Sequence, residues 1–351
     1  MPRPILTCLL MLSAIACLVG CQKTEPAADT EGAATPATPT RLQSAAAARK
    51  LAAAQTAARR HPQDAAVQME LGRLAYDEGA YNDAYRAYRR AAELQSTNYE
   101  AIVGLAKTNL KLQNPTEGLD WLLRAKRLKP GGVELKELEA RLLLVNGNFD
   151  RAIAAFQQAI EMNPKRTTTW LNLASAYALM NRPDEAVKTA REAVKIDPYD
   201  PAPHFALGRH MERAGDKTGA EAEYRQALAR DANDAPAMIA LARLLMDQNR
   251  RLEEARQMAV KASQIRTDRA DAATIAAWIL HLQGDDRKAA NELIKLVNAS
   301  PQNPEAWQKL SVVLSNIGKP NEAKQAGEMA QRFIPGRRAS ADLQMLDGDS
   351  N

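Results

Sequence analysis

The fold of this chain is decided by residues 167–200, which read TTTWLNLASAYALMNRPDEAVKTAREAVKIDPYD. One face of a first helix is indicated by side chains at the i, i+3, i+4 and i+7 spacing, namely Trp170, Leu173, Ala174 and Tyr177. Asn181 follows where a left-handed C-cap would end that helix, and Pro198 stops a second amphipathic stretch. The segment therefore predicts a helix–turn–helix unit.

The same pattern recurs along the chain every 34 residues. This period relates the prolines that end second helices, which are Pro62, Pro130, Pro164, Pro198, Pro301 and Pro335. A turn residue stands five positions before a packing alanine at Gly79, Gly147, Asn181, Gly215, Gly284 and Gly318. Pro198 and Pro301 are three periods and one residue apart, and Ala255 follows Asn249 by six positions. We therefore expect one inserted residue in the turn at 250–252.

These residues resemble the tetratricopeptide repeat, a family of 34-residue helix–turn–helix units. Its first-helix pair of leucine with a small residue matches at Leu71–Gly72, Leu173–Ala174 and Leu207–Gly208, and its second-helix pattern matches at Ala152, Phe156 and Ala159. The resemblance implies an all-α, right-handed solenoid of about eight units with a concave channel. The expected units are 65–98, 99–132, 133–166, 167–200, 201–234, 235–269, 270–303 and 304–337.

Three positions depart from the family's pattern. Gly118 replaces the packing alanine, Glu139 replaces the leucine, and Gly327 replaces the second-helix aromatic residue. The contacts at these positions in the second, third and last units are therefore expected to differ from those of the other units.

Segments at both ends of the array are expected to cap it. Residues 41–64 are rich in alanine, include Leu42 and Leu51, and reach the in-phase Pro62, so they predict a single helix that covers the first unit. Residues 338–351 predict a short C-terminal cap or tail. Stability should then be roughly a sum of unit and interface contributions.

The first forty residues carry targeting signals. Residues 1–20 read as a signal peptide, with Arg3 followed by an apolar run too short for a spanning helix. Leu18, Val19, Gly20 and Cys21 resemble the lipobox of bacterial lipoprotein precursors, which implies a lipid on Cys21 and removal of residues 1–20. Gln22 stands where an aspartate would imply inner-membrane retention, so the resemblance favours a periplasm-facing anchor in the outer membrane. Residues 21–40 lack large apolar side chains and predict a disordered tether.

Composition and motifs exclude several classes of function. All three cysteines lie within the first 21 residues, so no disulfide framework or cysteine metal site is expected downstream. Enzymatic motifs are missing from the sequence, and the four histidines lack metal-binding spacing; His204 is expected in the core or in a hydrogen bond between helices. A net charge of +5 from 47 basic and 42 acidic residues gives no nucleic-acid signature. We therefore expect no catalytic residue, metal or cofactor.

A column of charge marks a candidate peptide groove. In the family, the ninth residue of each unit lines the groove, and here this position holds Arg73, Lys107, Arg141, Ser175, Arg209, Arg243, Trp278 and Val312. An apolar stripe at the fifth position contains Met69, Val103, Leu171, Phe205 and Ile239. Cations beside apolar side chains suit an extended, amphipathic segment of a protein partner.

A structural interpretation of the same residues stays open at this stage. Acids at the second position of their units could pair with the cations between neighbouring first helices, namely Glu100, Glu134, Asp271 and Glu305. Such exposed pairs contribute only about 0–1 kcal/mol each. Phe205 could equally belong to the core.

These features predict a non-enzymatic scaffold that is tethered to the bacterial envelope through Cys21 and binds envelope proteins in its groove. The combination resembles the tetratricopeptide lipoproteins of type IV pilus assembly, which support the secretin pore and have about six units. The alternative is an accessory lipoprotein for exopolysaccharide export or envelope-hydrolase regulation; an enzyme is the remaining class. Members of this fold class often form homodimers, and no residue here decides whether this chain does.

Overall fold

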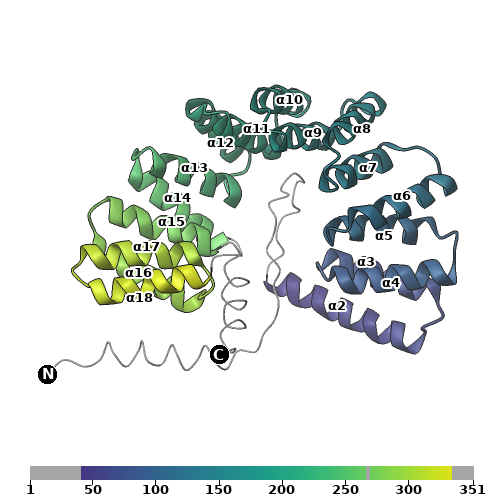
Figure 1. Cartoon of the computed structure of the whole chain (residues 1–351), viewed down its shortest axis with the longest axis horizontal. Helices are drawn as coiled ribbons and strands as arrows, with labels where there is room; N and C mark the ends of the chain where they lie inside the picture. Colours follow the sequence, from purple (N-terminus) through teal and green to yellow (C-terminus); the bar gives the residue numbers. More distant parts are fainter. Residues whose placement is uncertain (1–40, 266–268, 334–351) are drawn as a thin grey trace, which may run out of the picture. The chain divides into compact units, whose positions relative to one another are not determined.

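The computed structural model describes residues 41–265 and 269–333, and every regular element within these ranges is an α-helix. Helix α2 (Arg41–Arg60) is followed by eight helix pairs in chain order (Figure 1). The first helices of the pairs are α3 (Ala65–Asp77), α5 (Tyr99–Lys111), α7 (Val133–Val145), α9 (Thr167–Leu179), α11 (Pro201–Arg213), α13 (Ala235–Asp247), α15 (Arg269–Leu282) and α17 (Pro304–Asn316). The second helices are α4 (Tyr81–Leu94), α6 (Pro115–Leu128), α8 (Phe149–Met162), α10 (Pro183–Ile196), α12 (Lys217–Arg230), α14 (Leu252–Ile265), α16 (Asp286–Ala299) and α18 (Pro320–Arg332).

The predicted all-α solenoid of about eight units is confirmed. The predictions on residues 1–40, including the lipid on Cys21, and on the tail at 338–351 lie outside the described residues.

The helix ends follow from local sequence. Side chains that accept hydrogen bonds from first-turn N–H groups begin several first helices, namely Asp64, Asn98, Asp200, Asp234 and Asn303. Proline occupies the first helical position of α6, α10, α11, α17 and α18, where its missing N–H is not needed. The expected turn glycines and asparagines have positive φ, as at Gly79 (75°) and Asn181 (57°). Gln113 (φ 57°) fills this role in the second unit, where this turn position holds neither glycine nor asparagine.

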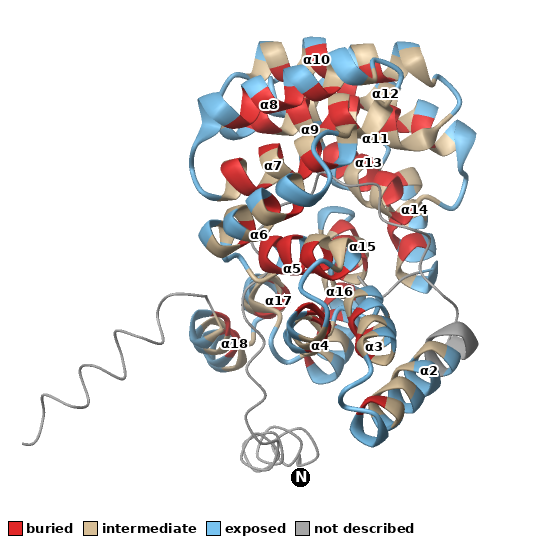
Figure 2. Ribbon diagram, turned by 90° about the vertical axis from the view of Figure 1, so that its right-hand side faces the viewer, coloured by how far each residue is buried: buried red, intermediate tan, exposed pale blue. Residues whose placement is uncertain are grey.

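Consecutive helices pack against each other throughout the array, and first helices also contact the first helices of neighbouring pairs, as in α3 with α5, α5 with α7, and α15 with α17. Figure 2 shows the buried residues along the sides of the helices that face their neighbours. Helix α2 packs on α3 through Leu51 and Ala58. Much of the core is alanine, which lets the helices approach closely.

Tyrosine rings packed on glycines hold the first and fifth pairs together. A Cβ added to Gly72 would lie 2.6 Å from Cδ1 of Tyr88, and one added to Gly104 would lie 2.8 Å from Cζ of the same ring. Gly208 is covered in the same way by Tyr224, whose Cδ1 would be 2.7 Å away. The family's leucine–glycine pair therefore serves close packing, because any side chain here would displace a buried ring.

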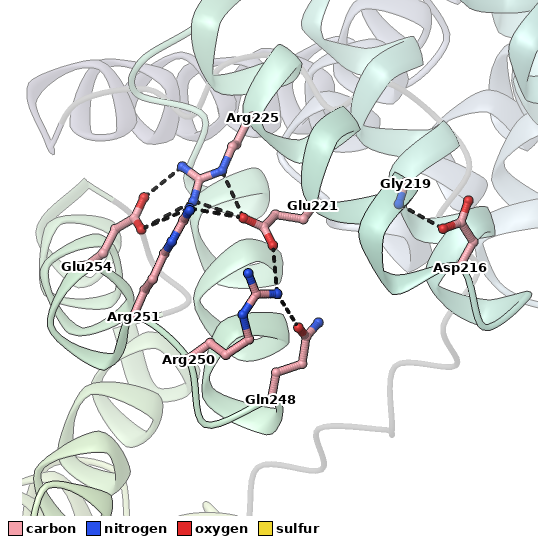
Figure 3. A network of polar contacts seen from close by, with 8 residues as sticks. All are labelled: Asp216, Gly219, Glu221, Arg225, Gln248, Arg250, Arg251 and Glu254. Atoms are coloured by element: carbon pink, nitrogen blue, oxygen red, sulfur yellow. Dashed lines mark hydrogen bonds and ion pairs between the residues drawn. The ribbon is translucent and has the colours of Figure 1, made fainter.

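The predicted insertion is confirmed in the turn between α13 and α14. Residues 248–251 separate these two helices, whereas three residues separate the helices of the other pairs. Asn249 (φ 51°) and Arg251 (φ 46°) both adopt left-handed backbone conformations. Figure 3 shows how Arg250 and Arg251 of this turn reach Glu221 of α12, with N–O distances of 3.6 and 3.3 Å. The longer turn thus brings two cations onto the preceding pair.

The three departures from the repeat pattern are accommodated by their neighbours. Glu139 pairs with Lys126 of α6 (2.7 Å) and Lys136 (2.9 Å) in place of a leucine contact. A Cβ on Gly118 would lie 2.5 Å from Cδ2 of Leu142, so the glycine makes room for that leucine. At Gly327 the nearest atom to an added Cβ is Oγ of Ser311, 3.4 Å away, so a serine of α17 lies beside the second helix at this position, and the buried ring of the last pair, Trp307, comes from α17.

Candidate binding surface on the first helices

The column of cations recurs at one position of five of the first six first helices, and Ser175 of α9 interrupts it. Arg73 lies on α3, Lys107 on α5, Arg141 on α7, Arg209 on α11 and Arg243 on α13. All are solvent-exposed except Arg141, which is half-buried. Each of these residues occupies the same position of its repeat unit, so the column lies on the layer formed by the first helices.

Arg141 lies in a region of uncompensated positive charge. Partial burial first, and the charge of Arg141 second, lower the pKa of Lys111 on α5. Burial raises the pKa of Tyr76 on α3, and Arg141 opposes this rise. Arg141 therefore acts on α3 and α5 from α7. No ion pair to Lys107, Lys111 or Arg141 is found among residues 41–265 and 269–333.

Burial also keeps a histidine beside the column neutral. His210 follows Arg209 on α11, and burial, followed by the charges of Arg209 and Arg213, lowers its pKa to about 4. Both Lys111 and His210 therefore lose protons more easily than usual next to column arginines. Burial is the main cause at both residues, and the neighbouring arginines add to it.

Arg73 differs from the rest of the column because it is paired within its own helix. Its guanidinium lies 2.7 Å from Glu70 and 3.4 Å from Asp77. The hydrogen bond to Arg73 lowers the pKa of Glu70, and that bond raises the pKa of Arg73.

The alternative that acids of one first helix pair with column cations of the next does not hold for Arg73, Glu134 and Glu305. Arg73 forms ion pairs with Glu70 and Asp77 of its own helix. Glu134 pairs with Arg166 at 3.1 Å. Glu305 pairs with Lys309 of its own helix at 3.4 Å. For Arg73 and Glu305 the reason is distance, because residues three or four apart on one helix are nearer than residues on the next unit.

The side chains of the predicted apolar stripe are half-buried or buried, and one unit interrupts the stripe. Met69, Val103, Phe205 and Ile239 pack against the core, and Leu171 is buried. Phe205 lies between the two predicted roles, since its ring is 5.9 Å from that of Tyr224 and 5.9 Å from the guanidinium of Arg209. The third unit places Glu137 at this position, which sequence reasoning missed.

Glu137 is buried and its carboxylate is already occupied. Arg166 donates from Nε at 3.0 Å, and the hydroxyl of Thr169 donates to the same carboxylate. The carboxylate thus joins α7 to α9 and interrupts the stripe between Val103 and Leu171.

Trp278 changes the column at the seventh unit. Its ring lies 4.4 Å from that of His281 and 4.5 Å from Nζ of Lys309 on α17. The cation at this level therefore comes from the following first helix and rests on the tryptophan ring. His281 is in turn bonded to Asp286.

A hollow lies between the second helices α4 and α6, and the sequence analysis did not predict it. Tyr85, Arg89, Trp121 and Arg124 line it. Glu117 accepts hydrogen bonds from the hydroxyl of Tyr85 (2.6 Å) and from Nε1 of Trp121 (3.0 Å). The available signal was Trp121 itself, since the equivalent positions of the preceding and following units hold alanine.

The prediction that His204 lies in the core or in a hydrogen bond between helices is confirmed. His204 is buried and bridges Glu223 of α12 (2.7 Å) and the carbonyl of Pro198 (3.2 Å). Within residues 41–265 and 269–333, no three side chains of the metal-binding types are grouped around a common point. No helix in these ranges combines the length and apolarity that crossing a membrane requires.

Comparison with known proteins identifies the repeat. Models of the tetratricopeptide repeat match residues 75–142, 138–201 and 205–269, which together are more than half of the chain.

The cellulose synthase operon protein C of Xanthomonas axonopodis is 31% identical over 202 residues, which are 55% of this chain and 12% of that protein. The human protein O-mannosyl-transferase TMTC3 is 26% identical over 192 residues, or 51% of this chain and 21% of that protein. The chain thus covers only a small part of these relatives' length. The crystal structure of yeast Tom70 has a TM-score of 0.63 at 16% identity, with 86% of this chain and 62% of that chain covered, and shares the fold.

Proposed function

On the premise that the chain belongs to the tetratricopeptide-repeat family, we propose that it is a non-enzymatic scaffold that binds an extended segment of an envelope protein along its first helices. Tetratricopeptide repeats bind protein partners. The cation column is the observation that supports binding along the first helices of this chain. Lys107, Arg141 and Arg243 recur on α5, α7 and α13. Arg141 and Lys107 have no ion-pair partner within the described residues.

The physical basis of binding is preformed charge beside apolar surface. Guanidinium groups donate to carboxylates and to backbone carbonyls in a fixed fork geometry. Val103, Phe205 and Ile239 lie half-buried on the same helix layer and supply apolar contacts. Because the packed helices fix these groups in place, most of the ordering entropy falls on the partner.

Cys21 is proposed as the attachment point. The lipobox at residues 18–21 supports a lipid anchor, the tether at 21–40 supports a body that stands off the membrane, and Gln22 favours the outer membrane. The Cys21→Ser variant should then move from the membrane to the soluble fraction. An unchanged membrane fraction would reject the anchor without affecting the groove.

Two envelope pathways remain candidates for the partner. Assembly of a type IV pilus or secretin complex is supported by the combination of lipobox and repeat array. Exopolysaccharide export is supported by the similarity to cellulose synthase operon protein C, although that match covers 12% of the relative. Regulation of an envelope hydrolase belongs to the same accessory class.

The groove is tested by affinity capture from detergent-solubilised envelope with the unmodified chain as bait. Arg141→Glu with Arg243→Glu should reduce the captured partner at least about tenfold, since each variant opposes a charge–charge contact and tenfold corresponds to about 1.4 kcal/mol. The matched control is Arg151→Glu with Arg191→Glu, which changes the same net charge on exposed sites of α8 and α10.

The outcome separates a binding role from a structural one. Loss of capture in the column variant alone, with unchanged helicity and urea midpoint, supports the groove. Equal loss of capture in both variants would mean that the partner responds to the net charge of the chain and not to the cation column. A captured secretin, polysaccharide porin or hydrolase would identify the pathway.

A further inference from the structure

The outer side of α2 is a second charged surface, separate from the cation column. Residues 41–63 contain five Arg and Lys residues and no Asp or Glu. Arg49, Lys50, Arg59 and Arg60 are all solvent-exposed on α2. None of the four has an ion pair within the described ranges 41–265 and 269–333.

The helix geometry places Arg49 and Arg60 on the side of α2 away from the solenoid. At about 100° per residue they lie within roughly 20° of each other and opposite Leu51 and Ala58, whereas Lys50 and Arg59 lie at the two edges. Leu51 and Ala58 pack toward α3. Figure 2 shows exposed positions along the free side of α2.

The neighbouring charged groups leave this surface positive. Lys50 lies at the edge toward α3, where it contributes to the lowered pKa of Glu70, whose main hydrogen bond is to Arg73. Arg59 lines a hollow together with Arg86 and Asp83 of α4, and those two side chains pair with each other. Glu70 and Asp83 are therefore already engaged by other arginines, and Asp64, which follows α2, accepts hydrogen bonds from the N–H groups of Ala66 and Val67.

We propose that α2 binds the anionic phospholipid surface of the membrane that carries the chain's lipid anchor. This inference rests on the proposed anchor at Cys21. The 19 residues between Cys21 and the start of α2 would have a root-mean-square reach of about 25 Å as a flexible chain, so α2 is the first described helix within reach of the lipid headgroups. Attachment at Cys21 raises the effective concentration of headgroups around α2.

The character of α2 favours a lipid surface over nucleic acid. Residues 41–63 contain no Phe, Tyr or Trp on which a base could stack. Its apolar side is used against α3, so α2 has no second apolar face to insert among acyl chains. Binding is therefore electrostatic, reversible and weakened by salt. Its effect is to hold the N-terminal end of the array against the bilayer and orient the first helices relative to it.

The test measures vesicle binding of the unlipidated chain, from residue 21 onward with Cys21→Ser. Vesicles of phosphatidylcholine with about one third phosphatidylglycerol are compared with vesicles of phosphatidylcholine alone. Each basic residue near an anionic surface strengthens binding by roughly fivefold. Arg49→Gln, Lys50→Gln, Arg59→Gln and Arg60→Gln together should therefore lower partitioning into the anionic vesicles by about 100-fold or more.

A matched control removes four charges elsewhere. Arg151→Gln, Lys188→Gln, Arg191→Gln and Arg287→Gln have the same effect on net charge, at exposed sites of α8, α10 and α16. Glutamine is a good helix former, so both variants should keep the helicity of the unmodified chain. The control should bind anionic vesicles within about threefold of the unmodified chain, because its charges lie on other helices.

Each outcome decides the proposal. Selective loss in the α2 variant supports it, as does release of bound protein by salt. Equal binding to neutral vesicles, equal loss in both variants, or no binding would overturn it, and tighter binding to polyuridylic acid than to the vesicles would assign α2 to nucleic acid instead. Membrane fractionation of Cys21→Ser in cells reports on the anchor independently, so failure of the anchor and failure of the α2 surface are distinguishable.

Discussion

Arginines between α12 and α14 and arginines on the first-helix column are the same residue type in opposite electrostatic settings. Arg225 lies 2.7 Å from Glu254 and 3.2 Å from Glu221, and hydrogen bonding to Glu254 raises its pKa. Arg141 has no ion pair in the described part of the chain and lowers the pKa of Lys111. The Arg225 charge therefore joins α12 to α14, whereas the Arg141 charge on α7 has no ion pair among the described residues and stays available to a partner.

The largest effect expected from this contrast is a pH dependence at His210. Its pKa in the folded chain is about 4, because of burial and then Arg209 and Arg213, and lies below the ordinary value of 6.5. Above pH 6.5 the side chain is neutral in both states and its full contribution is present. As the pH falls from 6.5 to 4, the unfolded chain takes up the proton first, so about 3 kcal/mol of stability is lost.

Urea unfolding of the unmodified chain and of His210→Gln, followed between pH 7 and pH 4, measures this loss. The variant should lose less stability over that range, since glutamine does not titrate. A titration of His210 by NMR with a midpoint at or above 6.5 would contradict the assignment.

The Glu221→Gln substitution removes the carboxylate that pairs with the arginines between α12 and α14. The Glu221 carboxylate is mostly buried and serves Arg225, Arg250 and Arg251 (Figure 3). Removing its charge leaves three guanidinium groups close together, and the expected loss is about 2 kcal/mol in the free energy of unfolding. Glu292→Gln is the control, because Glu292 makes one exposed pair with Lys295 and should change stability by less than about 0.5 kcal/mol. Equal urea midpoints for the two variants would mean that the network does not join the units.

Features that depend on residues close together in the chain could be predicted from the sequence, whereas contacts between residues far apart in the chain could not. The period, the turns and the inserted residue at 248–251 were predictable because they rest on residues close together in the chain. Gln113 was missed at its turn because glutamine rarely adopts positive φ, and Glu137 was missed because its partner Arg166 lies 29 residues away. The column positions followed from the repeat register, but the partners of Arg73 and Glu134 depended on distances that periodicity does not contain.

A smaller effect of opposite sign is expected at Lys111. Lys111→Met removes a charge that partial burial and Arg141 both disfavour, and methionine keeps an apolar stem of similar length. We expect a gain of about 0.5 kcal/mol, comparable to relief of a like-charge pair on a helix. Lys188→Met on α10 is the matched control and should be neutral. A lower urea midpoint for Lys111→Met would show that Lys111 has a stabilising partner and is not part of an uncompensated surface.

Arg73 gives the smallest effect on stability and the finest test of the comparison, because it belongs to the column by position and to the paired arginines by contact. Both of its pairs are exposed, so Arg73→Gln should lower the free energy of unfolding by less than about 0.5 kcal/mol. A partner must displace Glu70 before it reaches the Arg73 guanidinium, whereas Arg141 requires no such exchange. In the capture assay, Arg73→Gln should therefore reduce the bound partner less than Arg141→Gln does. If the two variants reduced capture equally, the ion pairs of Arg73 within its own helix would have no influence on partner binding. Position in the repeat would then be enough to make a cation part of the binding surface.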